Sequence, residues 1–159
     1  KLAQQKPESK PVLIIVGDGP DRPRLEGIAA SLKSNCKIIL AGQRNDVWSI
    51  LCGVDTVIHP SAGEGLSLAI LEAMAAAQPV VVPNLPSVSQ TIEHGTCGFV
   101  YKDNSLDGAS QLLYDIANNK TLRAELGANA RRLVLEKYQL EHATKDFKDK
   151  VLPVLFSSL

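Results

Sequence analysis

The feature that most constrains the fold is a repeated alternation of short β-branched runs with helical segments. Residues Val12 to Val16 form a continuous apolar run that ends at Gly17-Asp-Gly-Pro20. Such a run is typical of a strand buried on both faces, as in a parallel sheet. The segment after it repeats apolar residues at helical spacing, with Asp21 available as its N-cap. Because strands and helices alternate, we expect a doubly wound, three-layer α/β domain with a parallel sheet.

The same alternation continues as far as residue 101, and helices follow it. We expect further strands at residues 37–41, 56–59, 80–82 and 98–101, and helices at residues 47–52, 66–77, 106–117, 121–138 and 141–152. The chain thus ends in helices, and the last of them stops at Pro153 because proline cannot continue a helix. A length of 159 residues predicts a single domain, residues 1–159.

Composition and charge exclude several classes of function. The chain has 17 Lys and Arg residues against 17 Asp and Glu residues and no basic run, which argues against nucleic-acid binding. Its apolar runs fall far short of the roughly 18 residues that cross a bilayer. Three widely spaced cysteines predict reduced thiols, and the three histidines lack metal-ligand spacing. We therefore expect a cytoplasmic protein without a bound metal.

The strongest local signal for chemistry is the loop that leaves the third strand, residues 60–68. Glycines there let the backbone approach a ligand, and the N–H groups of Gly65, Leu66 and Ser67 would point out of a helix start. A helix start of this kind favours phosphate. Glu64 would repel a phosphate unless it faces another part of the ligand, such as sugar hydroxyls. The alternative is that Glu64 only complements the helix dipole.

Glu72 is the second carboxylate of this region. It is the only charged residue within residues 66–77, so we expect a mostly buried helix in which Glu72 needs a hydrogen-bonding partner. A solvent-facing Glu72 is the alternative. If the helix included Glu64, the eight-residue spacing would correspond to roughly 12 Å. That is too far for a glycosidase-type carboxylate pair but suits the two ends of an extended nucleotide.

Two further loops follow predicted strands. Gly42, Gln43 and Arg44 could offer backbone groups or a guanidinium to a base or phosphate, although a simple turn in which Asp46 caps the next helix fits equally well. The loop after the first strand begins with Gly17-Asp-Gly-Pro20. It has Arg22 where a dinucleotide-binding fingerprint would have its third glycine, so a tight turn is the simpler interpretation.

A longer pattern joins these features. Glu64 and Glu72 are separated by seven residues and lie between Pro60-Ser61 and Ala73-Met-Ala75, in a chain that also carries the Val12 run and Pro79-Val-Val81. In order and spacing, residues 12–138 resemble the C-terminal, nucleotide-sugar-binding domain of retaining GT-B glycosyltransferases of the group 1 family. The resemblance implies a Rossmann-like domain that forms the C-terminal half of a two-domain enzyme.

The resemblance also implies roles for individual residues. Glu72 would accept hydrogen bonds from the ribose hydroxyls, and the backbone from Gly65 through Leu66 and Ser67 to Leu68 would hold the diphosphate. Glu64 would be the catalytic residue, on hydroxyls of the transferred sugar. Gly42, Gln43 and Arg44 would contact the base. By the same resemblance, the enzyme transfers a sugar from a nucleotide diphosphate sugar to a hydroxyl acceptor with retention, in glycan biosynthesis, without a metal or other cofactor.

The chain also departs from the family pattern. It lacks the Arg and Lys clamp that family members carry upstream and the N-terminal acceptor domain, so we expect the isolated chain to be inactive. That domain would be the chain's partner and could supply a peripheral membrane contact. Ala77 stands where the family usually has glycine. Two alternatives stay open: a nucleotide-sugar-binding module without catalysis, and half of a sugar-nucleotide epimerase.

Overall fold

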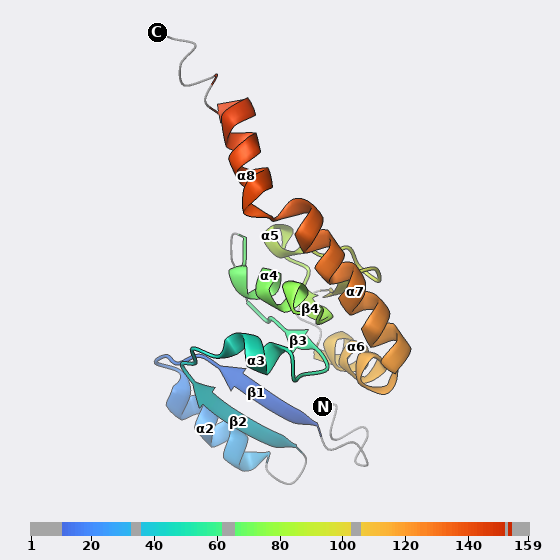
Figure 1. The fold of residues 1–159 in the computed structure, drawn as a ribbon. Coiled ribbons are helices and arrows are strands. Elements are labelled where there is room, and N and C mark those ends of the chain that lie inside the picture. Colours follow the sequence, from blue (N-terminus) through green and yellow to red (C-terminus); the bar gives the residue numbers. More distant parts are fainter. Residues whose placement is uncertain (1–10, 33–35, 62–65, 103–105, 152, 154–159) are drawn as a thin grey trace.

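The computed structural model describes residues 11–32, 36–61, 66–102, 106–151 and 153 (Figure 1). The predicted strands and helices follow one another in the expected order, and the structure adds a short helix between the last two strands. The strands are β1 (Val12–Val16), β2 (Lys37–Gly42), β3 (Val57–Ile58), β4 (Val80–Pro83) and β5 (Gly98–Tyr101). The helices are α2 (Arg22–Ser31), α3 (Val47–Leu51), α4 (Leu68–Ala75), α5 (Pro86–Ser89), α6 (Leu106–Asn118), α7 (Lys120–Lys137) and α8 (Leu140–Asp146), and a π-helical segment, η1 (Phe147–Val151), continues α8.

The described strands pair in parallel, which confirms the α/β class with a parallel sheet. They form two separate sheets, however: β1 pairs with β2, and β3, β4 and β5 pair in that order. In the first sheet Val12 lies opposite Lys37. In the second, Val80 lies opposite Val57 on one side and Gly98 on the other. β4 is therefore the central strand of the larger sheet.

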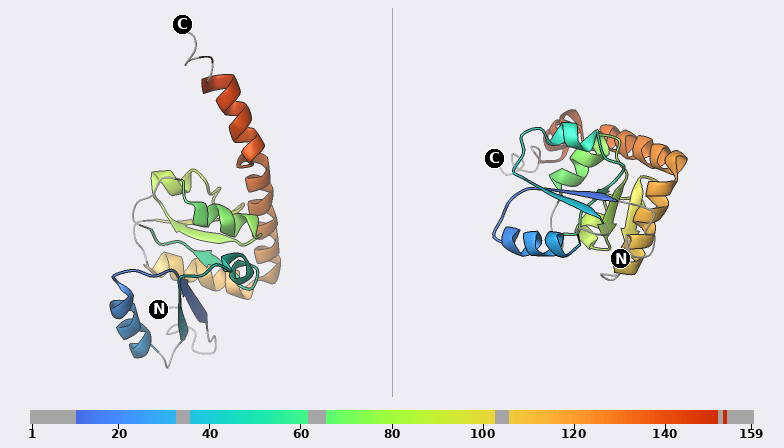
Figure 2. Two further views of the ribbon diagram at one scale, coloured as in Figure 1. Left: turned by 60° about the vertical axis from the view of Figure 1, so that its left-hand side comes forward. Right: turned by 90° about the horizontal axis from the view of Figure 1, so that it is seen from below.

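The core is built around β4. Val80, Val81 and Val82 have no exposed surface. Because successive side chains of a strand point to opposite faces, Val80 and Val82 pack in a cluster with Ile70 and Met74 of α4, whereas Val81 packs in a second cluster with Ile116 of α6. Figure 2 shows helices on both sides of these strands. The layered arrangement explains why a continuous valine run is needed at this position.

The prediction that residues 12–16 are buried on both faces is wrong. Val12, Leu13 and Val16 are 56, 40 and 38% exposed, and α2 beside them has no buried residue. The physical reason is that β1 has a described neighbour on one edge only, and the described residues do not enclose its sheet in two helical layers. The apolar run forms a strand, but a strand with much of its apolar surface in solvent.

The two aspartates considered as helix caps lie directly before their helices but do not cap them. Asp21 precedes α2 and Asp46 precedes α3, and neither side chain accepts a backbone N–H of its helix. Their carboxylates instead accept hydrogen bonds from nearby arginines, which are charged and therefore stronger donors. Asn119 is a true cap, since its Oδ1 accepts the Leu122 N–H of α7 at 2.9 Å.

Helix α7 crosses the end of α4 at close range. Nη1 of Arg131 donates to the Ala75 carbonyl at 2.8 Å, and Gly127 of α7 lies directly against the backbone of Ala77. Ala77 has a φ of +58°, in the left-handed region that side chains disfavour. The backbone conformation of this junction therefore favours glycine, but the chain has alanine there.

Replacing Ala77 with glycine is expected to raise the free energy of unfolding by about 1 kcal/mol, because glycine adopts a positive φ without the steric cost of a Cβ. Urea unfolding followed by circular dichroism measures the change. The matched control is Ala76→Gly, where φ is −77°. Glycine there should destabilise by roughly 0.5–1 kcal/mol. Equal effects of the two variants would contradict the strain at Ala77.

The C-terminal helical segment extends away from the body of the molecule. Figures 1 and 2 show α8 and η1 leading outward from the end of α7. Two of their large apolar side chains, Leu140 and Phe147, are 78 and 49% exposed. No helix in the described ranges is both long and apolar enough to cross a membrane.

Candidate functional site

The start of α4 is the best-defined part of the candidate site. Ser67 is the N-cap residue, with an extended backbone, and only 7% of it is exposed. Its Oγ lies 3.4 Å from Nε2 of His59, the residue that follows β3. The contact ties the end of β3 to the start of α4. His59 is one of the three histidines without metal-ligand spacing, and its place directly after the third strand is the sequence signal that could have marked it as a site residue.

The first turn of α4 has backbone donors that no other described residue accepts. The helix begins at Leu68, two residues later than expected, so the N–H groups of Leu68, Ala69 and Ile70 have no acceptor within the helix. The side chain of Ser67 does not accept one of them, and the first turn carries no acidic residue. Open donors at the positive end of a helix attract an anion. Glu64 and Gly65, which precede this turn, lie outside the described residues.

The prediction that Glu72 is buried is wrong, and the solvent-facing alternative holds in this structure. Helix α4 buries Ile70, Ala73 and Met74, while Glu72 lies on the opposite, exposed face. The reason is that α4 packs with one face against β4 and α7, and the described residues do not cover the other. The Glu72 carboxylate forms no hydrogen bond or ion pair with another described residue. It remains available to a ligand.

The exposed face of α4 is also apolar. Leu68 is 70% exposed, and Leu66, just before the helix, is 56% exposed. Glu72 follows Leu68 by one helical turn, so both lie on the same side of α4. Open amides, apolar side chains and one carboxylate are thus gathered on one side of a single helix. A site for an organic anion combines the same elements.

The loops after β1 and β2 form a second group. Gly17 N–H donates to the carbonyl of Gly42 at 2.8 Å, and the Asp18 carboxylate pairs with Arg22 at 3.5 Å beside Gly42. Gly42 has a φ of +64°, which is why a glycine ends β2. The structure therefore brings the first two loops of the chain together, with Gln43 and Arg44 following at their edge.

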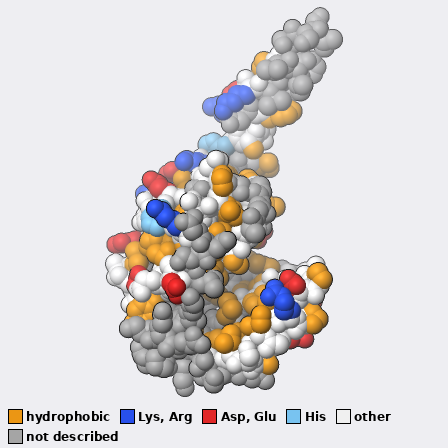
Figure 3. Space-filling model, turned by 180° about the vertical axis from the view of Figure 1, so that it is seen from behind, with side chains coloured by type: hydrophobic (Ala, Val, Ile, Leu, Met, Phe, Trp, Pro, Cys, Tyr) orange, Lys and Arg blue, Asp and Glu red, His pale blue; other side chains and the backbone are white. Residues whose placement is uncertain are grey.

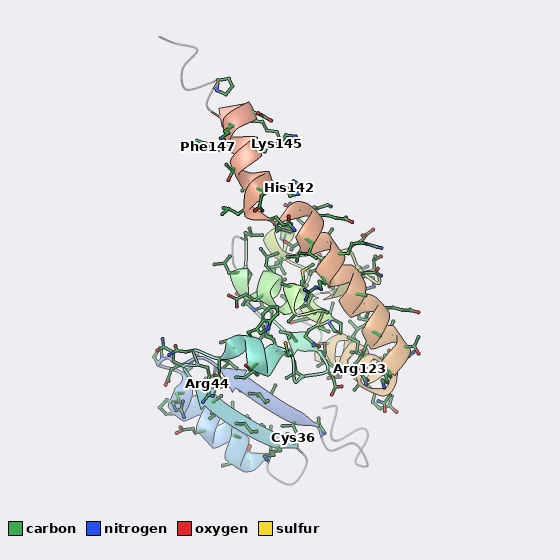
Figure 4. The ribbon with its side chains drawn as sticks, in the orientation of Figure 1. Cys36, Arg44, Arg123, His142, Lys145 and Phe147 are labelled. Atoms are coloured by element: carbon green, nitrogen blue, oxygen red, sulfur yellow. The ribbon has the colours of Figure 1, made fainter. Side chains whose placement is uncertain are left out.

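The side chain of Arg44 is already paired. Its Nε and Nη2 donate to the two carboxylate oxygens of Asp46 at 2.7 and 2.6 Å, in a solvent-exposed bidentate pair. The hydrogen bond raises the pKa of Arg44 and lowers the pKa of Asp46. Figure 4 shows Arg44 beyond the end of β2. With its charge matched by Asp46, Arg44 offers a ligand its backbone more readily than its guanidinium.

The predicted site residues fall into two groups in this structure. Leu66, Ser67, Leu68 and Glu72 belong to the start of α4, and Gly42, Gln43 and Arg44 belong to the loop after β2. Between the two groups, the described ranges show no hydrogen bond or ion pair. Over the same ranges, no three His, Cys, Asp or Glu side chains cluster as metal ligands. The cysteines are free thiols, and burial raises the pKa of Cys97, which disfavours a reactive thiolate there.

Comparison with known proteins places this chain in a family. The family model described as glycosyl transferases group 1 matches residues 1–133. Among curated relatives, an N-acetyl-alpha-D-glucosaminyl L-malate synthase from Bacillus anthracis is 24% identical over 90% of this chain and 38% of its own length. An uncharacterized glycosyltransferase from Haemophilus influenzae is 30% identical over 92% of this chain and 41% of its own length. The chain thus spans about two fifths of these relatives.

Solved structures share the fold. The crystal structure of TarM superposes with a TM-score of 0.81 at 25% identity, covering 93% of this chain and 30% of that one. The structure of Anabaena HepE in complex with UDP gives a TM-score of 0.80 at 22% identity, covering 99% of this chain and 43% of that one. Together with the family match, these findings show that the chain has the fold of GT-B glycosyltransferases and belongs to the glycosyl transferases group 1 family.

Proposed function

We propose that this chain forms the donor-binding part of a retaining GT-B glycosyltransferase that transfers a sugar from a nucleotide diphosphate sugar to a hydroxyl acceptor. The observation that carries the proposal is the start of α4. There the buried Ser67 is held against His59, the first-turn amides have no acceptor within the helix, and Glu72 is exposed one turn further on. A diphosphate and an adjoining ribose have the charge and the hydroxyl groups that these donors and this carboxylate would bind.

Each predicted site residue has a place in this proposal. The backbone from Gly65 through Leu66 and Ser67 to Leu68 holds the diphosphate, and Glu72 accepts hydrogen bonds from the ribose hydroxyls. The loop of Gly42, Gln43 and Arg44 contacts the base through its backbone, since the Arg44 side chain is paired with Asp46. Glu64 acts as the catalytic residue, on hydroxyls of the transferred sugar. The exposed Leu66 and Leu68 would lose water when the donor binds.

The proposed chemistry needs electrostatic stabilisation more than proton transfer by the protein. When the bond between the anomeric carbon and the donor's phosphate oxygen breaks, the nucleoside diphosphate leaves with the electron pair and gains negative charge. The positive end of α4 stabilises that charge without a metal. The acceptor hydroxyl would attack from the face that the diphosphate leaves and give its proton to the departing phosphate oxygen, which would retain the anomeric configuration.

The names of the relatives favour transfer over the two alternatives. Curated relatives include a galactosyltransferase from Escherichia coli, 28% identical over 87% of this chain, and an alpha-D-kanosaminyltransferase from Streptomyces kanamyceticus, 29% identical over 82%. The HepE structures contain UDP or UDP-glucose, so a uridine nucleotide is the first ligand to test. Because this chain spans only part of its relatives, we propose that the rest of the protein forms the acceptor domain. The chain alone would then bind donor without transferring sugar.

The proposal is tested by replacing Glu72. Glu72→Ala should weaken UDP binding to the purified chain about tenfold or more, because a charge-assisted hydrogen bond contributes roughly 1.5–3 kcal/mol. Isothermal titration calorimetry measures the dissociation constants. The control is Glu136→Ala, which removes an exposed carboxylate of α7 that pairs with Arg132 at 3.9 Å. Its affinity for UDP should equal that of the unaltered chain.

Three outcomes would contradict the proposed role of this face. In the first, Glu72→Ala and Glu136→Ala bind UDP with the same affinity. In the second, the unaltered chain binds none of UDP, GDP and ADP at millimolar concentration. Binding of UDP-glucose no tighter than that of uridine would also count against the proposal, because the diphosphate would then contribute nothing at the start of α4.

A further inference from the structure

Ser67 stands at the start of α4 but does not cap the helix with its side chain. Its carbonyl accepts the Leu71 N–H at 3.2 Å, which is the first hydrogen bond of the helix. At such a position a serine hydroxyl commonly accepts the N–H of the second or third helical residue. In α4 these residues are Ala69 and Ile70, and the Ser67 side chain accepts neither N–H. The helix therefore lacks a cap that its own sequence provides.

Helix α7 of the same chain shows the ordinary arrangement. Its N-cap residue, Asn119, accepts the N–H of Leu122, the third helical residue, at 2.9 Å. The corresponding N–H in α4 belongs to Ile70. The backbone is extended at both cap residues, with φ −122° and ψ 93° at Asn119 and φ −81° and ψ 112° at Ser67. The backbone conformation thus permits Ser67 to cap, and the reason that it does not lies in its side chain.

The hydroxyl of Ser67 is held by His59. Oγ of Ser67 lies 3.4 Å from Nε2 of His59. Because only 7% of Ser67 is exposed, its hydroxyl needs a partner within the protein. The histidine tautomer decides which of the two groups donates, but in either direction the contact fixes the place of Oγ. His59 therefore keeps the Ser67 hydroxyl away from the amides of α4.

The neighbours of Ser67 in the sequence offer its hydroxyl no alternative. Leu66 and Leu68, directly before and after it, have apolar side chains that lie largely in solvent. Figure 3 shows hydrophobic side chains along the hollow between the part of the molecule that holds β1, β2 and α2 and the remainder as well. Side chains of this kind cannot form a hydrogen bond. Without His59, the first-turn N–H groups of α4 are the partners that a cap serine ordinarily takes.

The backbone of His59 is itself firmly placed. Its N–H donates to the carbonyl of Val81 at 3.0 Å, and Val57 in the same strand donates to the carbonyl of Pro79 at 3.0 Å. Val81 belongs to β4, the fully buried central strand of its sheet. Pro60 follows His59 in the sequence and restricts its backbone to an extended conformation. The imidazole therefore projects from a rigid part of the core.

We propose that His59 is a positioning residue of the donor site, which acts by preventing Ser67 from capping α4. The N–H groups of the first turn then remain for the donor's diphosphate. The inference rests on the proposed function, which places the diphosphate at these amides. A capping hydroxyl would put an oxygen of the protein where a phosphate oxygen binds, so the ligand would have to displace it. In this arrangement α4 forgoes the stability of a cap and keeps its donors for an anion.

Replacing His59 with leucine in the 159-residue chain tests the inference. Ser67 should then cap α4, and UDP should bind about fivefold more weakly, which corresponds to the roughly 1 kcal/mol of a serine cap. This loss should require the Ser67 hydroxyl. In a pair of chains that both carry Ser67→Ala, His59→Leu should change the affinity less than about twofold, because the coupling is already broken. Calorimetric titration of the four chains with UDP gives the dissociation constants.

A measurement without ligand separates this inference from the proposed function. The three-bond NMR couplings that report χ1 of Ser67 should change in His59→Leu, because the hydroxyl turns toward the amides of α4. His59→Gln, whose side-chain amide reaches about as far as Nε2 and also forms hydrogen bonds, should keep the Ser67 rotamer and most of the affinity. Thr56→Val is the structural control, since it removes the hydrogen bond from Thr56 Oγ1 to the Pro79 carbonyl at 3.0 Å. It should lower the Tm and leave the affinity for UDP unchanged.

Three results would overturn the inference. One is an equal loss of affinity from His59→Leu with and without the Ser67 hydroxyl, since His59 would then act on the ligand itself or on the fold. Another is an equal loss of affinity from Thr56→Val, which would indicate general loosening of this region. The third is a Ser67 rotamer that stays the same in His59→Leu. If the unaltered chain binds no UDP, the proposed function fails, and the Ser67 couplings alone decide whether His59 restrains the hydroxyl.

Discussion

Replacing Gly127 with alanine is expected to lower the free energy of unfolding by about 3 kcal/mol. A Cβ at this position would lie 2.0 Å from the carbonyl oxygen of Ala77 and 2.9 Å from its carbonyl carbon. Both are backbone atoms and cannot rotate away. Helix α7 would have to move off α4, and its neighbouring side chains Leu126 and Ala130 are buried in the two core clusters. Overpacking of this kind costs typically 1–3 kcal/mol and occasionally more.

Thermal unfolding should show the loss as a fall in Tm of roughly 6–12 °C for a chain of this size. The matched control is Gly27→Ala, at a helical glycine of α2 where a Cβ would meet no atom within 4 Å. Alanine is the better helix former, so that variant should gain roughly 0.5–1 kcal/mol. If Gly127→Ala unfolds within 1 °C of the unaltered chain, α7 does not pack on Ala77 as described.

Replacing Leu68 with proline is expected to weaken UDP binding about tenfold to a hundredfold while leaving the fold intact. Leu68 is the first residue of α4, a position where proline is favourable and where the lost N–H has no acceptor within the helix. Ser67 before it is extended, with φ −81° and ψ 112°, as a residue preceding proline must be. The substitution therefore removes one donor from the proposed diphosphate site, and a hydrogen bond to a charged group contributes roughly 1.5–3 kcal/mol.

A second helix provides the control for this substitution. Lys120 is the first residue of α7, after the extended cap residue Asn119. Lys120→Pro should leave both the Tm and the affinity for UDP within experimental error of the unaltered chain. Calorimetric titration of the two variants, with circular dichroism to verify their folding, makes the comparison. Unchanged affinity in a folded Leu68→Pro variant would exclude the Leu68 amide from the diphosphate site.

Much of the fold could be predicted because strand and helix signals act locally. The apolar run at residues 12–16 forms β1 within the same bounds, and the valines at 80–82 form the buried strand β4. Burial could not be predicted in the same way, because it depends on which elements lie on either side. The same kind of apolar run is fully buried in β4, between two strands, and largely exposed in β1, which has one described neighbour.

The candidate site was predictable in position but not in detail. The helix start after the third strand follows from the loop glycines and from the strand order. The exposure of Glu72 does not, because an apolar helix can be covered on one face or on both. The Arg44–Asp46 pair likewise takes the place of the cap that was one of the two alternatives for Asp46, since a charged donor two residues away competes with the helix amides. Arg123, whose guanidinium pairs with Asp55 at 3.3 Å, gave no signal of that contact in the sequence.

Buried side chains are distributed unevenly along this chain, and its local stability should differ accordingly from one segment to another. Within the described ranges, every buried side chain lies at Ser67 or later, and the elements before it contribute only partly covered surface. Segments with few buried apolar contacts open at low free-energy cost. The half that holds Gly42 and Arg44 should therefore open locally while the half that holds Ser67 and Glu72 stays folded. A donor that spans both halves would bind only the form in which both halves are folded. Part of its binding free energy would then be spent on ordering the less stable half.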